Sequence, residues 1–96
     1  DATILELTNK LNAIRFEINS LNEQVQIIEK IVIDYETLVS AEERKFSLGE
    51  SSLFLINTRE QKLIDARLKE NSLFTKRLKS YVSYFNLLGL ADITLN

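Results

Sequence analysis

Hydrophobic residues recur every three and four positions along the first half of the chain. Between residues 4 and 46, thirteen positions follow this alternation, and twelve of them are apolar. The a positions are Ile4, Leu11, Ile18, Val25, Val32, Val39 and Phe46, and the d positions are Leu7, Ile14, Leu21, Ile28, Tyr35 and Glu42. A sustained repeat of about 3.5 residues is typical of a left-handed coiled coil, since a straight helix would drift off such a seam. The pattern predicts one long helix over about residues 3–48.

A second helical stripe occupies most of the second half, with a less regular phase than the first. It comprises Leu53, Ile56, Leu63, Ile64, Leu68, Phe74, Leu78, Tyr81, Val82, Phe85 and Leu88. We expect a helix over about residues 52–88. Gly89 is interpreted as a second helix stop, which leaves residues 89–96 as a short tail.

One of the two glycines, Gly49, lies between the two stripes, close to the midpoint of the chain. Glycine just past a helix end adopts the left-handed conformation without a Cβ penalty. Ser51 or Ser52 can then cap the next helix, because a hydroxyl oxygen accepts from an orphan backbone N–H. The sequence therefore predicts a tight turn over about residues 48–51. The predicted fold class is all-α, an antiparallel two-helix coiled-coil hairpin.

Several large apolar residues of the first helix lie off its a/d seam. They are Phe16, Ile27, Ile31, Ile33 and Leu38. Two helices alone would leave them uncovered, so they indicate contact with more than one neighbour and assembly into a helical bundle. We expect the isolated fragment to be a homo-oligomer, most simply a dimer. The alternative to contact with several neighbours is that the off-seam residues are only irregular patterning on a hairpin that merely dimerises.

Composition excludes several classes of protein. The 96 residues contain no Cys, His, Met, Trp or Pro. The absence of Cys and His removes the usual nucleophile–base pairs and the usual zinc ligands, so we expect no enzyme, no cofactor and no metal site. There is no apolar run long enough to span a membrane and no signal peptide. The start at Asp1 and the missing initiator Met predict a piece cut from a longer protein.

The net charge of −2 hides an asymmetry between the halves. Residues 1–48 carry nine acidic and five basic side chains, whereas residues 49–96 carry five acidic and seven basic ones. Opposite net charges of −4 and +2 favour folding of one half back on the other. The basic residues after the turn are scattered around the helix and are typical of a solvated face, so no nucleic-acid partner is expected.

The residues around the turn resemble a known family. The segment Phe46-x-x-Gly49-x-x-Ser52-Leu53-x-x-Ile56, followed by Leu63-Ile64-x-Ala66-Arg67 and closed by Leu87-Leu88-Gly89, is similar to the repeat of the TolC-like outer-membrane efflux proteins. That repeat carries an aromatic, a Gly three residues on, then Ser-Leu, a Val-Leu-Asp-Ala step, and Leu-Leu-x-Ala-Arg. The resemblance covers about residues 40–90, and the preceding helix matches in length and pattern only.

The resemblance implies a homotrimeric channel with a periplasmic tube of paired helices in a Gram-negative outer-membrane protein. Residues 1–96 would be a tip hairpin of that tube, in the C-terminal repeat, and would not span the membrane. A periplasmic adaptor protein would dock at the turn. The implied contact residues are Leu48, Gly49, Glu50, Ser51, Ser52 and Leu53.

Two other interpretations remain open. Adaptor proteins also contain a two-helix hairpin, whose tip shows Arg-x-x-x-Leu followed by Ser seven residues after the Leu. Arg59 and Leu63 match the start of that pattern, whereas Glu70 occupies the Ser position. The second alternative is an unrelated coiled-coil module.

Overall fold

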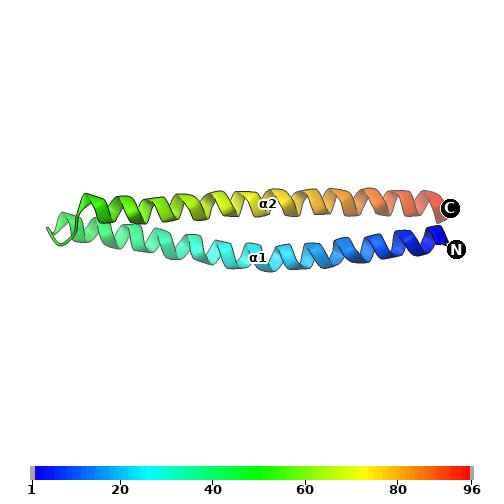
Figure 1. Cartoon of the computed structure of the whole chain (residues 1–96), viewed down its shortest axis with the longest axis horizontal. Coiled ribbons are helices and arrows are strands. Elements are labelled where there is room, and N and C mark those ends of the chain that lie inside the picture. Colours follow the sequence, from blue (N-terminus) through cyan, green and yellow to red (C-terminus); the bar gives the residue numbers. More distant parts are fainter. Residues whose placement is uncertain (1, 96) are drawn as a thin grey trace. The chain divides into compact units, whose positions relative to one another are not determined.

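Two α-helices make up the structure, a computed structural model that describes residues 2–95. Helix α1 is Ala2–Ser47 and helix α2 is Leu53–Leu95, and residues 48–52 connect them (Figure 1). The helices pair in opposite directions. The predicted all-α antiparallel hairpin is therefore confirmed, and the connection extends one residue beyond the predicted turn.

The helix pair divides into two units, which we describe separately. Unit 2 is Val25–Ser72 and contains the turn; unit 1 joins α1 up to Gln24 with α2 from Leu73 onward. Unit 2 has two ion pairs between the helices, Arg59 with Glu42 and Arg67 with Glu36. In unit 1 the Arg77 Nη1 donates to the Asn22 Oδ1 at 3.2 Å. In unit 2 the partners of Arg59 and Arg67 are residues 42 and 36, so rising residue numbers on α2 meet falling numbers on α1.

The predicted heptad seam of α1 is the side of this helix that packs. Every seam position from Leu7 to Glu42 is buried or half-buried, and Val25 is the most buried, with 1% of its surface exposed. The outermost predicted positions, Ile4 and Phe46, are exposed instead. Residues in an end layer have packing neighbours on only one side, which explains this difference from the prediction.

Helix α2 packs through a different face from the one its apolar residues indicate. Its buried and half-buried positions include a strict alternation of three and four residues: Ile56, Arg59, Leu63, Ala66, Glu70, Leu73, Arg77, Ser80, Tyr84, Leu87 and Ala91. Of the eleven residues in the predicted stripe, only Ile56 and Leu63 are buried and Phe74 is half-buried. The predicted phase was wrong because five of these seam positions are charged, hydroxyl-bearing or phenolic.

The predicted helix stop at Gly89 and the tail beyond it were also wrong, since α2 continues to Leu95. Gly49 has a φ of 78°, and it is the one glycine with positive φ in the described chain. Gly89 is therefore a helical residue. A glycine inside a helix costs about 1 kcal/mol relative to alanine, which continued packing of Leu87 and Ala91 can offset. Asn96 lies outside the described residues.

The two glycines generate opposite predictions. Gly49→Val should lower the free energy of unfolding by about 1–2 kcal/mol, because a side chain at this φ is strained even in open space. Gly89→Ala should raise it by up to about 1 kcal/mol, because an added Cβ meets nothing within 4 Å and the helix gains propensity. Urea unfolding followed by circular dichroism measures both. If both substitutions changed the free energy of unfolding by the same amount in the same direction, Gly49 and Gly89 would not differ in backbone conformation as described.

Buried and exposed β-branched residues of α1 provide a second test. Ile28→Ala and Val32→Ala should each destabilise by roughly 1–4 kcal/mol, because both side chains are buried and their truncation leaves a cavity. Ile33→Ala is the control and should change stability by less than about 0.5 kcal/mol beyond its helix-propensity effect, since Ile33 is exposed. A large loss for Ile33→Ala in dilute solution would show that another surface covers this residue.

Candidate functional site at the interhelical turn

The end of α1 is closed by a Schellman motif centred on Gly49. The Glu50 N–H donates to the Lys45 carbonyl at 2.8 Å, and the Gly49 N–H donates to the Phe46 carbonyl at 3.0 Å. These two bonds require a left-handed residue, and the φ of Gly49 provides it. The predicted left-handed role of Gly49 is confirmed, and α1 therefore ends in a defined geometry.

The start of α2 is capped by Ser52. The Leu55 N–H donates to the Ser52 Oγ at 3.2 Å, and the Ile56 N–H donates to the Ser52 carbonyl at 3.1 Å. This is the bonding of an N-cap residue, so the structure decides between the two serines left open by the sequence. The Ser51 Oγ is instead buried without a hydrogen-bond partner in the described part of the chain. Ser51 is therefore not a freely exposed surface residue.

The structure brings the six predicted contact residues together at one end of unit 2. Leu48, Gly49, Glu50, Ser52 and Leu53 are exposed, and Ser51 is half-buried. Leu48 and Leu53 each leave more than 60% of their surface uncovered. Large apolar side chains rarely gather in the open on a monomer without a binding role.

Three further exposed apolar residues flank the turn and were not among the predicted contact residues. They are Phe46, Phe54 and Leu55, and Phe54 is 76% exposed. We call the exposed apolar residues Phe46, Leu48, Leu53, Phe54 and Leu55 the tip surface. Phe54 could have been found from its position two residues before the seam residue Ile56, which points it away from α1.

A buried carboxylate lies one helical turn below the tip surface. Glu42 is 5% exposed and occupies a seam position of α1. Its Oε1 lies 4.0 Å from the Arg59 Nε, and its Oε2 lies 4.0 Å from the Lys45 Nζ. Attraction from both cations offsets part of the cost of removing the carboxylate from water. This charged layer interrupts the apolar seam close to the tip surface.

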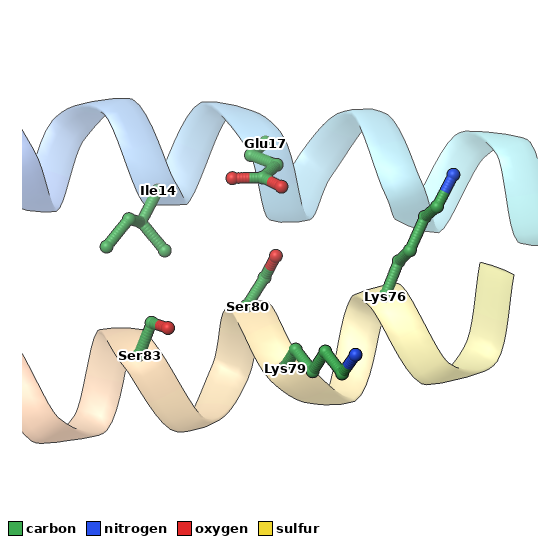
Figure 2. A pocket seen from close by; sticks show the side chains of 6 residues that line it. All are labelled: Ile14, Glu17, Lys76, Lys79, Ser80 and Ser83. Carbon is green, nitrogen blue, oxygen red and sulfur yellow. The ribbon is translucent and has the colours of Figure 1, made fainter. Parts of the chain in front are cut away.

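A hollow in unit 1 is another place where polar groups converge. It is lined by Ile14 and Glu17 of α1 and by Lys76, Lys79, Ser80 and Ser83 of α2. Figure 2 shows the Ser80 hydroxyl directed toward the Glu17 side of the hollow and Lys76 reaching toward α1. Ser80 itself is buried in the α2 seam. Side chains of both charges share this space, which is typical of a solvated hollow.

Two classes of site are not found among residues 2–95. No group of three or more His, Cys, Asp or Glu side chains could hold a metal ion. Neither helix contains a stretch apolar enough to cross a membrane.

Comparison with known proteins leaves the function open. No family model, curated protein or solved structure matches this chain.

The charged layer gives a testable energetic prediction. Arg59→Leu should lower stability by about 1–3 kcal/mol, because the buried Glu42 carboxylate loses its partner across the helix pair. The double variant Glu42→Leu/Arg59→Leu should recover this loss or exceed the wild-type stability, because an apolar layer needs no charge compensation. A double-mutant cycle by urea unfolding gives the coupling. Additive single effects would show that the two charges do not interact.

Proposed function

We propose that this chain is the periplasmic tip hairpin of a TolC-like outer-membrane efflux channel, and that the turn docks the adaptor of a tripartite pump. The proposal is supported by the resemblance around Phe46, Gly49, Ser52 and Leu53. The observation that carries it is the exposure of the tip surface on a turn of defined geometry. In this role the chain forms part of the channel wall and binds the adaptor.

A turn built this way suits end-on recognition. The Schellman bonds and the Ser52 cap hold both helix ends, so the tip surface is ordered before a partner arrives. Preorganisation lowers the entropic cost of binding. Phe54 and Leu48 provide the large exposed side chains that act as anchors in protein interfaces, and Glu50 adds one charge beside them.

The apolar residues off the seam support a homotrimer in the full-length channel. Ile27 and Ile33 of α1 are more than half exposed in the hairpin, and so are Leu68, Leu78 and Phe85 of α2. In a tube of paired helices each of these faces would meet a neighbouring helix. The proposed location is the periplasmic part of the channel.

The adaptor-hairpin alternative is less favoured by the structure. Arg59, Leu63 and Glu70 all occupy the α2 seam, and Arg59 pairs with Glu42 of the same hairpin. Recognition of a channel by Arg59 would compete with its ion pair inside the hairpin. An unrelated coiled-coil module would bind partners along the helix sides, and this difference in location separates it from the proposal.

The test is capture of the adaptor by the full-length channel carrying this segment, co-produced with the adaptor from the same genome and measured by crosslinking. Glu50→Lys, Ser52→Asp and Phe54→Ser should each reduce capture by about tenfold or more, because they change charge or remove an anchor at the tip. Ser52→Asp keeps a good N-cap residue, so its hairpin stays folded. Ser51 is omitted because its hydroxyl is buried.

Lys30→Glu is the matched control, since it changes an exposed charge on α1 away from the turn. It should leave capture unchanged. Wild-type capture by all three tip variants would refute the tip assignment. Loss of capture in Lys30→Glu alone would favour binding along the helix side.

A further inference from the structure

The buried apolar side chains are distributed unevenly between the two units, although the units are of equal length. Among the described residues, unit 1 has three of them, Ile18, Leu21 and Leu73. Burial of apolar surface is the main favourable term in folding, so it stabilises unit 2 more than unit 1. The buried apolar residues of unit 2 are Val25, Ile28, Val32, Val39, Ile56, Leu63 and Ala66.

The α2 seam explains this difference. In unit 1, three consecutive seam positions are Arg77, Ser80 and Tyr84, whose side chains carry a charge or a hydroxyl group. Ser80 is buried, but its short side chain removes little apolar surface from water when it packs. The α1 seam of unit 1 is therefore apolar, while the α2 surface opposite it is largely polar.

The seam arginines of the two units differ in their partners. Arg59 of unit 2 faces the carboxylate of Glu42. Arg77 of unit 1 donates to the neutral amide oxygen of Asn22, and its guanidinium lies 5.3 Å from the centre of the Phe74 ring. A half-buried charge needs a counter-charge to offset its lost hydration, and the ring replaces only part of that attraction. The Arg77 layer is therefore expected to hold the helices together less strongly than the Arg59 layer.

Unit 1 also has weaker helices. Gly89 lies inside α2, where glycine lowers helix propensity, and both ends of the chain belong to this unit. Most helical stability in proteins comes from the packing of an amphipathic face. When α1 and α2 part in unit 1, both are therefore expected to lose helix as well. Such opening breaks backbone hydrogen bonds, so it is detectable at the amides.

We infer that unit 1 is a separate cooperative unit, which opens while unit 2 and the turn remain folded. Opening uncovers the seam residues Ile18, Leu21 and Leu73 together, whereas the turn at Gly49 keeps its bonds. The hairpin thus combines a turn of fixed geometry with a half whose helices can part. This inference does not depend on the docking proposed at the tip.

Hydrogen exchange followed by mass spectrometry, on the 96-residue chain in dilute solution, tests the opening. Amides of residues 14–21 and 73–84 should share one opening constant, at least about tenfold larger than that of residues 28–39 and 56–66. Low concentrations of urea should accelerate the second set more steeply, because its exchange requires unfolding of the whole chain. Protection that rises residue by residue from the chain ends, or one opening constant for both units, would overturn the inference.

Two matched substitutions test whether the units open separately. Ile18 in unit 1 and Ile28 in unit 2 are both buried in the α1 seam, with 7% and 8% of their surface exposed. Ile18→Val should accelerate exchange in both units by about two- to tenfold, because Ile18 is unpacked in the partial and in the global opening. Ile28→Val should accelerate unit 2 alone, since Ile28 stays packed when unit 1 opens. Equal acceleration of unit 1 by both variants would show that the whole chain opens at once and overturn the inference.

A second matched pair tests the polar α2 seam as the cause. Ser80→Ala should slow the exchange of unit 1 by about two- to fivefold, because alanine has a higher helix propensity and leaves no hydroxyl in the seam. Ser40→Ala is the control, since Ser40 is an exposed serine of α1 in unit 2, and it should leave unit 1 unchanged. Unchanged or faster exchange of unit 1 in Ser80→Ala would overturn the assignment of its weakness to this seam.

Discussion

The structure depends on the burial of one heptad stripe from each of two helices against the other. A hairpin of two helices has room for one such seam, so each helix keeps most of its circumference in contact with solvent. Val25 and Leu21 of α1 are deeply buried, whereas Ile27 and Ile33 on other faces of the same helix are exposed. Features outside the seam, including the tip surface and the exposed apolar residues of α2, follow from this shortage of partners. Functional interpretation is therefore directed to the uncovered faces.

The first helix could be predicted from sequence almost completely, and the packing face of the second could not. In α1, period and hydrophobicity agree, so the seam from Leu7 to Glu42 follows from counting residues. In α2 the two signals separate. Arg59, Glu70, Arg77 and Ser80 occupy the seam, while Leu78 and Phe85 lie outside it. Apolar periodicity identifies the most hydrophobic face of a helix. In α2 that face is not the one that packs against α1.

The turn shows which local signals are decisive. Gly49 was predicted to be left-handed because both flanking helices needed a reversal there, and its φ and the two Schellman bonds agree. Gly89 is also a glycine near the end of an apolar stripe, but no second helix follows it, and α2 continues through it. The predicted contact residues from Leu48 to Leu53 were chosen from the position of the turn, whereas the exposure of Phe54 depends on the orientation of α2. The identity of a partner does not follow from this geometry.

The Schellman turn at Gly49 also affects the order in which the helices pair during folding. The ion pair between Glu42 and Arg59, beside the turn, closes a loop of 17 residues, whereas the hydrogen bond between Asn22 and Arg77 joins residues 55 apart. Loop closure costs more entropy as the loop lengthens, so contacts next to the turn form most cheaply. Pairing is then expected to start at the turn and progress toward the termini. A left-handed residue that fixes the reversal would thus influence the folding rate as well as the position of the tip.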